Sequence, residues 1–263
     1  MQLTPNGTAY DLHGDKHNPA LVLIHGLGLT HQTWHDYIHA LKDDYFIIAY
    51  DLLGHGQSAL PTRQVTLSLL SEQLNELLTH LQVNKAHLLG FSLGGMINRR
   101  FAMDYPDKTA SLLILNSPHE REDALQKKVE AQAQASADAG VAGVLEAAIK
   151  RWFTPSFIES SPDKVNWVRQ TLHNNHPENY AAHRYVLAAG VTELIRPRPP
   201  LHFPCLIITC ENDSGSTPAM SGAIHDEITN SKVIIIPELQ HLGLLEQPDM
   251  FLQPIKDFLK QIA

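Results

Sequence analysis

Short apolar runs recur along the chain, and most of them end in a glycine or a polar residue. They read "ALVLIHG" from residue 20, "YFIIAYD" from 45, "AHLLG" from 86, "TASLLILNS" from 109, "CLIITCEND" from 205 and "SKVIIIPELQH" from 231. Short continuous apolar runs bounded by turn residues are typical of strands that are buried on both faces. The pattern therefore predicts the strands of a mostly parallel sheet.

Residues with helical spacing lie between these runs. Leucines recur on one predicted helical face at Leu67, Leu70, Leu74, Leu77, Leu78 and Leu81. Further helices are expected from near Leu93, around Ala219 to Ile228, and at the C-terminal end up to Ile262. Alternating strands and helices predict a doubly wound α/β sheet with right-handed crossovers, whose ligand sites lie at the carboxyl ends of the strands.

The alternation stops between residues 119 and 200. This segment includes "EREDALQKKVEAQAQASADAGVAGVLEAAIKRWF", which is rich in alanine and predicts helices without an intervening strand. The proline-dense "IRPRPPLHFP" marks its end, and the strand pattern then resumes. We expect a core formed by residues 1–118 and 201–263, with an inserted helical cap at 119–200.

The composition and net charge disfavour two classes of binding partner. The formal net charge is −8 and the isoelectric point is about 6.0, which disfavours nucleic acid and anionic membranes because both require a basic surface. The sequence contains neither a run of 18 apolar residues nor a basic segment followed by an apolar stretch near residue 1. We therefore expect a cytoplasmic protein without a membrane span, either a monomer or a homodimer.

Cysteine and histidine usage suggests no metal centre. Cys205 and Cys210 are five positions apart on a predicted strand, so their side chains point to opposite faces and are expected to be buried free thiols. His31, His35 and His39 share one predicted helical face. Because no HExxH motif or Cys/His ligand cluster accompanies them, a solvated helical face is favoured over a metal site.

One serine is surrounded by glycines in "GFSLGGM", residues 90–96. Glycine destabilises regular structure, so this clustering indicates a backbone that needs close approach or unusual dihedral angles. Gly90, Ser92 and Gly94 match G-x-S-x-G, the signature of a sharp turn between a strand and a helix that exposes a nucleophile. A structural glycine turn is the alternative for this motif taken alone.

A serine nucleophile needs a base and a group that orients the base. Asp213 follows the strand "CLIITC", and His241 follows "KVIIIPEL", so both are expected at the carboxyl edge of the sheet that carries Ser92. Glu211 is the alternative carboxylate, and Asp213 is favoured because its short side chain lies deeper in the loop. His225, the other histidine after Asp213, falls on a predicted helix.

Acyl transfer also requires donors for a developing oxyanion. The backbone N–H of Leu93 directly follows the serine at a predicted helix N-terminus, where an anion is favoured. The second donor is expected to be the N–H of Leu27 within "HGLG". The alternative for "HGLG" is a tight exit from the strand.

A second glycine-containing segment, "DLLGHGQS" from residue 51, raises the question of phosphate binding. It lacks the Lys-Ser/Thr pair of a P-loop and does not match G-x-G-x-x-G. A structural loop held by Asp51 is the favoured interpretation.

The motifs "HGLG", "DLLGHGQS", "GFSLGG", "END" and "QHLGLLEQP" resemble the α/β-hydrolase superfamily in type and order, across nearly the whole chain. The chain order Ser92, Asp213, His241 is the order of that superfamily. "RWFTPSF" and the serine turn look like the branch of 3-oxoadipate enol-lactonases and small carboxylesterases. The resemblance implies the α/β-hydrolase fold with a helical cap, and a Ser-His-Asp triad that needs no cofactor or metal.

The resemblance also implies a small ester or lactone as substrate. Carbon–carbon bond hydrolases and cofactor-free haloperoxidases share the serine triad and stay open as alternatives, as does a ligand-binding receptor on the same fold. Among the cap aromatics, Trp152 is the best candidate for the wall of a substrate pocket, with a place in the packed interior of the cap as the alternative.

Overall fold

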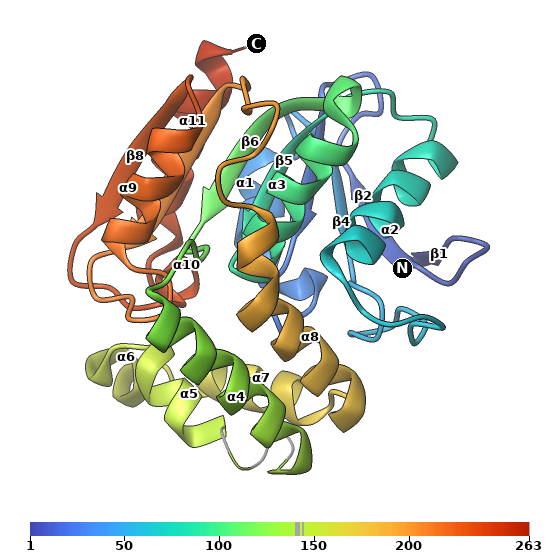
Figure 1. The fold of residues 1–263 in the computed structure, drawn as a ribbon. Coiled ribbons are helices and arrows are strands. Elements are labelled where there is room, and N and C mark those ends of the chain that lie inside the picture. The colour runs from blue at the N-terminus through green and yellow to red at the C-terminus, as the bar shows by residue number, and fades with distance from the viewer. Residues whose placement is uncertain (140–142, 144, 263) are drawn as a thin grey trace.

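The computed structural model describes residues 1–139, 143 and 145–262 (Figure 1). These residues form an eight-stranded sheet in the order β1-β2-β4-β3-β5-β6-β7-β8. The strands are β1 (Gln2–Leu3), β2 (Ala9–His13), β3 (Ala20–Ile24), β4 (Phe46–Tyr50), β5 (Ala86–Phe91), β6 (Thr109–Leu115), β7 (Cys205–Cys210) and β8 (Ser231–Ile236). From β4 to β8 all neighbours are parallel, whereas β1–β2 and β2–β4 pair antiparallel.

The six strands β3 to β8 confirm the strands predicted from the apolar runs. Every residue of β3 is buried, as expected for a central parallel strand covered on both faces. The apolar pattern does not predict β1 and β2, because "AYDLH" is broken by polar residues. This antiparallel pair lies at one edge of the sheet, where one face can meet water and no continuous apolar run is required.

Helices and short 3-10 turns connect the strands. They are η1 (His31–Trp34), α1 (His35–Leu41), α2 (Leu67–His80), α3 (Leu93–Asp104), η2 (Pro106–Lys108), α4 (Asp123–Ala139), α5 (Leu145–Trp152), α6 (Pro155–Ser160), α7 (Pro162–His173), α8 (Pro177–Ala189), η3 (Gly190–Glu193), α9 (Pro218–Glu227), α10 (Gly243–Glu246) and α11 (Pro248–Gln261). In Figure 1, α2, α3 and α9 lie in front of the sheet, and α1 and α11 lie behind it. The sheet is therefore covered on both faces, as the sequence predicts for a doubly wound fold.

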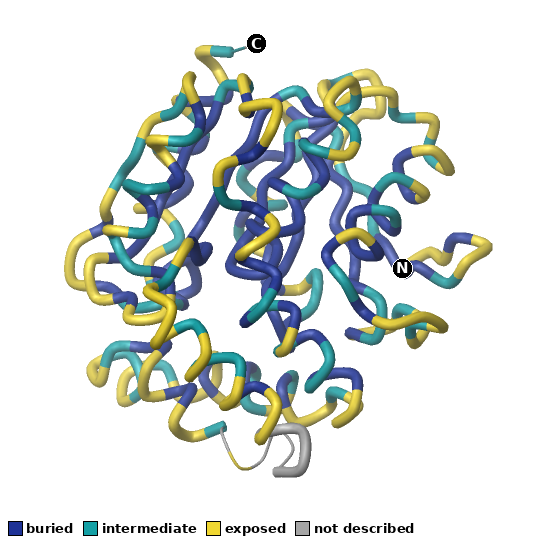
Figure 2. The backbone as a smooth tube through the Cα atoms, viewed as in Figure 1, coloured by how far each residue is buried: buried dark blue, intermediate teal, exposed yellow. Residues whose placement is uncertain are grey.

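Local sequence explains where α2 begins and which face it buries. The side chain of Thr66 accepts a hydrogen bond from the N–H of Leu69 and so caps the helix N-terminus. The leucines at the predicted helical spacing are buried in the core, where α2 packs on α3, except for Leu81, which directly follows the helix and is partly buried. Figure 2 shows the central strands in the buried colour, whereas exposed backbone is concentrated in outer helices, loops and the edges of the sheet.

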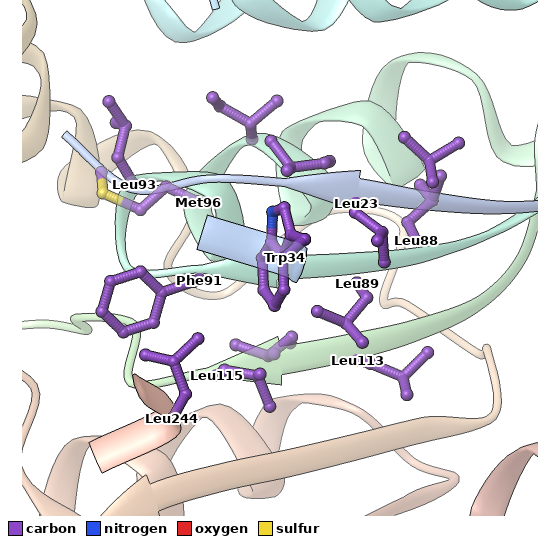
Figure 3. Packing of buried hydrophobic residues seen from close by; sticks show 14 of the residues in the cluster. Leu23, Trp34, Leu88, Leu89, Phe91, Leu93, Met96, Leu113, Leu115 and Leu244 are labelled. Carbon is purple, nitrogen blue, oxygen red and sulfur yellow. The ribbon is translucent and has the colours of Figure 1, made fainter. Parts of the chain in front are cut away.

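The core is continuous along the parallel strands. Figure 3 shows Trp34 among buried side chains of the sheet, including Leu23 and Leu89, and the same cluster includes Leu244 from the segment after β8. These four side chains have no exposed surface. Burying one large apolar side chain contributes about 1.5–3 kcal/mol to the free energy of unfolding. Packing of these four side chains therefore helps to hold the strands in fixed positions.

Helices α4 to α8 follow β6 and precede β7, the place expected for the cap (Figure 1). Residues 140–142 and 144 of the predicted cap lie outside the described residues, as does residue 263 of the predicted core. The division into a core and a cap stays a prediction. Across the parts of the chain that the structure describes, no helix has the length and apolar character needed to cross a membrane.

Candidate active site

Ser92 occupies the sharp turn between β5 and α3. Its φ of 54° and ψ of −111° lie in a region that side-chain-bearing residues rarely adopt, as expected for the turn of a G-x-S-x-G motif. A Cβ on Gly90 would lie 2.1 Å from the Gly94 carbonyl oxygen, and one on Gly94 would lie 2.1 Å from the Ile24 oxygen. The motif therefore needs glycine at both positions because backbone segments approach too closely for a side chain.

The structure brings Ser92, His241 and Asp213 together. His241 Nε2 lies 3.2 Å from Ser92 Oγ, and His241 Nδ1 lies 2.6 Å from Asp213 Oδ2. Ser92 is only 5% exposed and Asp213 only 2%. This arrangement can move a proton from the hydroxyl to the imidazole while the carboxylate stabilises the resulting charge.

Backbone and side-chain donors surround the Asp213 carboxylate. Its Oδ1 accepts hydrogen bonds from the N–H groups of Gly215 and Ser216, each at 2.9 Å, and its Oδ2 accepts one from Asn116 Nδ2 at 2.9 Å. Burial acts to raise the pKa of Asp213, but the charge of His241 and these hydrogen bonds outweigh it, so the pKa lies below its ordinary value. The carboxylate is consequently ionised and its orientation is fixed.

Asn116 and Ser117 are parts of this site that the motif analysis did not identify. Ser117 Oγ donates to the Ser92 carbonyl oxygen at 2.9 Å and accepts from the buried Arg99 guanidinium at 3.1 Å. Burial lowers the pKa of Arg99 to about 10, which leaves it charged at neutral pH. The signal in the sequence was that Asn116 and Ser117 directly follow the strand "TASLLIL", at the same carboxyl edge as the serine turn.

The two alternative residues lie elsewhere. Glu211 is exposed and accepts the N–H of Glu238 at 3.0 Å. His225 is exposed on α9 and lies 2.7 Å from Ser231 Oγ. Of the two candidate carboxylates, Asp213 is the one that lies against the imidazole of His241.

Two backbone amides lie beside the serine. Leu93 is the first residue of α3, and Leu27 lies in the loop after β3. A Cβ on Gly26 would lie 3.3 Å from Ser92 Cβ, so this loop packs directly against the serine. Within residues 1–139, 143 and 145–262, neither the Leu27 nor the Leu93 N–H donates a hydrogen bond to the chain. That these two N–H groups bind an oxyanion stays a prediction.

Trp152, the last residue of α5, lies beside the imidazole of His241. Its ring centroid lies 6.0 Å from that of His241, and its carbonyl oxygen accepts the Leu242 N–H at 2.8 Å. Phe153 is fully buried and stacks on Phe157 with 5.2 Å between the ring centroids. Trp152 thus borders the site, whereas Phe153 belongs to the packed interior.

The histidines near residue 31 differ in their surroundings. His35 and His39 are exposed, as expected for a solvated face, but that expectation is wrong for His31. His31 Nδ1 lies 2.9 Å from the fully buried Asp51, and its Nε2 lies 3.4 Å from Asp11. The described residues contain no group of three or more histidine, cysteine or acidic side chains arranged for a metal ion.

Asp51 holds the segment "DLLGHGQS" as the sequence predicts. Its carboxylate accepts the backbone N–H groups of His31 and Gln57, at 2.8 and 2.9 Å. Burial acts to raise the pKa of Asp51, but the side-chain and backbone hydrogen bonds from His31 and the backbone N–H of Gln57 help to outweigh burial, so the pKa lies below its ordinary value. Cys205 and Cys210 are buried free thiols, also as predicted, and burial raises the pKa of each.

Comparison with known proteins agrees with this architecture. Residues 19–248 match the family described as alpha/beta hydrolase fold. The chain is 29% identical over 253 residues to the Acinetobacter baylyi protein named 3-oxoadipate enol-lactonase 2, covering 96% of this chain and 92% of that protein.

Two solved structures are similar over nearly their whole length. The enol-lactonase from Burkholderia xenovorans LB400 has a TM-score of 0.85 at 24% identity, covering 96% of each chain. A thermophilic esterase from Thermogutta terrifontis has a TM-score of 0.85 at 25% identity, covering 97% of this chain and 93% of the other. This chain therefore belongs to the alpha/beta hydrolase family of enzymes.

Proposed function

We propose that this enzyme is a serine hydrolase that cleaves a small carboxylic ester or lactone through an acyl-enzyme on Ser92. The observation that carries the proposal is the pair of hydrogen bonds that links Ser92 Oγ to His241 and His241 to the buried Asp213. The names of the similar proteins, enol-lactonase and esterase, support an ester or lactone as the scissile group.

In the proposed mechanism, Ser92 Oγ attacks the substrate carbonyl carbon while His241 Nε2 takes the hydroxyl proton. The tetrahedral intermediate then collapses, the carbon–oxygen bond of the ester breaks, and the imidazolium gives its proton to the leaving alkoxide. In a lactone the released alcohol stays on the acyl chain. A water molecule next attacks the acyl-enzyme, with His241 again as base, and releases the carboxylic acid and free Ser92.

The backbone N–H groups of Leu27 and Leu93 would stabilise the negative charge on the carbonyl oxygen. Each such donor contributes about 2.7–4 kcal/mol, judged from the effect of removing one. Trp152 would form an apolar wall next to His241 and help to exclude water from the reacting atoms. Asn116 would hold Asp213 in the orientation that His241 requires.

The central test is S92A with a chromogenic short-chain ester and a set of unsubstituted lactones. Loss of a triad nucleophile lowers kcat by roughly 10⁴–10⁶, so S92A should be nearly inactive while it melts close to the wild-type temperature. The control is S68A, because Ser68 is an exposed serine on α2. A fluorophosphonate should label the wild type and S68A on Ser92 and leave S92A unlabelled.

Normal turnover by S92A would refute the proposal. Turnover that stops after one equivalent of product, with the ligand retained, would instead favour a receptor. Hydrolysis of vinylogous 1,5-diketones without ester cleavage would favour a carbon–carbon bond hydrolase.

A further inference from the structure

The loops after β3 and β4 hold each other through two buried imidazoles. His25 Nε2 accepts the Leu52 N–H at 3.0 Å, and His55 Nε2 accepts the Gly28 N–H at 3.0 Å. An accepting nitrogen carries no proton, so the Nδ1 of each ring is protonated and faces a backbone carbonyl oxygen, at 2.8 and 3.2 Å respectively. Each loop thus supplies one histidine to the other.

Both rings are neutral in the folded protein. Burial lowers the pKa of His25 to about 4. Burial, together with the neighbouring His183 and His25, holds the pKa of His55 well below its ordinary value. The acceptor role of both Nε2 atoms is therefore maintained at neutral pH.

These contacts act on the turn that contains Leu27. The Gly26 carbonyl oxygen accepts from His25 Nδ1 at 2.8 Å and from the Leu29 N–H at 3.2 Å. In a trans peptide the carbonyl and the N–H point in opposite directions, so fixing the Gly26 carbonyl also fixes the Leu27 N–H. The next peptide is fixed by the hydrogen bond from Gly28 N–H to His55.

The segment between α7 and α8 holds the same turn from the other side. Asn175 Nδ2 donates to the Gly28 carbonyl oxygen at 2.9 Å and also to the carbonyls that end α7. A Cβ on Gly28 would lie 2.9 Å from Tyr180 Cε2, which shows how closely α8 packs on the turn. Three consecutive peptide units are thus held by buried or half-buried side chains.

The α8 helix also contacts the loop that supplies His55. Asn179 Nδ2 donates to the Gly54 carbonyl oxygen at 2.7 Å. The His183 ring meets the His55 ring edge to face, with 4.6 Å between centroids and 86° between planes. Docking of α8 therefore supports the imidazole that binds Gly28.

We propose that His55 and Asn175 are positioning residues that hold the two polar groups of Gly28 and thereby, together with the contact from His25 to the Gly26 carbonyl, set the direction of the Leu27 N–H toward the oxyanion. The inference rests on the proposed function, because it assigns a source of order to the oxyanion donor of that reaction. It makes the α7–α8 segment part of the catalytic geometry.

The test compares H55F, H55Q, N175A and the double variant H55F/N175A, with N174A as the matched control. Asn174 is the exposed neighbour of Asn175. For each variant, kcat and KM are measured with the short-chain ester, together with the inhibition constant of a trifluoromethyl ketone. That probe forms a charged tetrahedral adduct with the serine and so reports on the oxyanion donors.

Misplacement of a catalytic group by about 1 Å costs roughly 10²-fold, so H55F should lose up to about that factor in kcat. KM should stay within about threefold, because the loss falls on the transition state. H55Q should recover most of the loss, since its Oε1 can accept the Gly28 N–H. N175A should lower kcat by about tenfold in the same way, and N174A should match the wild type.

The double variant tests whether both residues act on the same turn. Its loss in kcat should be smaller than the product of the two single losses, because groups that share a partner are not additive. Inhibition by the trifluoromethyl ketone should weaken in parallel with kcat. Equal losses in H55F and H55Q, an unchanged kcat in N175A, or fully multiplicative losses would each overturn the inference.

The measurements distinguish a failure of this inference from a failure of the proposed function. Activity in S92A would refute the serine mechanism, whereas an inactive S92A with wild-type kcat in the His55 and Asn175 variants refutes only this inference. If H55F does not fold, N175A decides, because Asn175 is only half-buried.

Discussion

Replacing His183 with phenylalanine should make the protein less sensitive to acid. His183 has no exposed surface on α8, and its Nδ1 donates to the Asn179 carbonyl oxygen at 2.9 Å. Its Nε2 has no hydrogen-bond partner among the described residues. Burial lowers the pKa of His183 to about 4, and the nearby His25 adds to this effect although the hydrogen bond to Asn179 opposes it.

The magnitude follows from linkage between protonation and folding. An unfolded histidine has a pKa of about 6.5, so between that pH and about 4 the unfolded chain binds a proton that the folded protein does not. The free energy of unfolding therefore falls as the pH falls, by about 1.4 kcal/mol per pH unit for this group. At pH 5 the single histidine costs about 2 kcal/mol, a large part of the 5–15 kcal/mol typical of a domain.

The assay is urea denaturation of the wild type and H183F at intervals from pH 5 to 8. Phenylalanine keeps an aromatic ring against His55 but does not titrate. The slope of unfolding free energy against pH should therefore decrease by about 1.4 kcal/mol per pH unit. The control is V186A, a buried truncation on the same helix, which should lower stability by a similar amount at every pH. Parallel curves for H183F and the wild type would refute the assignment of His183 as a buried neutral group.

Two further pairs of variants test the site and its turn. D213N should lower kcat by about 10⁴-fold while KM changes little, because His241 loses the carboxylate that fixes its tautomer. Steady-state kinetics should show no such loss in E211Q, which changes the exposed alternative carboxylate. A large loss in E211Q would reverse the assignment. G94A should be strongly destabilised, because its Cβ would lie 2.1 Å from a backbone oxygen, whereas G222A meets no atom within 4 Å on α9 and should gain about 1 kcal/mol in urea titrations. A stable G94A would contradict the close approach.

The sequence predicted much of the fold because its signals are local. Continuous apolar runs marked β3 to β8, and leucine spacing marked α2. The same signals missed β1 and β2, whose short polar-interrupted strands pair at the edge of the sheet. Helical spacing did not predict the surroundings of His31, because this side chain binds Asp51, which directly follows β4.

The chain by itself determined the order of strands β3 to β8, the glycine turn around Ser92 and the sequential order of Ser92, Asp213 and His241. These follow from side-chain periodicity and from steric demands within a few residues. Only the tertiary structure decided that Asp213 reaches His241, that Asn116 supports it, and that His55 accepts the Gly28 N–H. Those contacts join residues 27 to 97 positions apart, and their geometry depends on how sheet, loops and helices pack together, which no local pattern encodes.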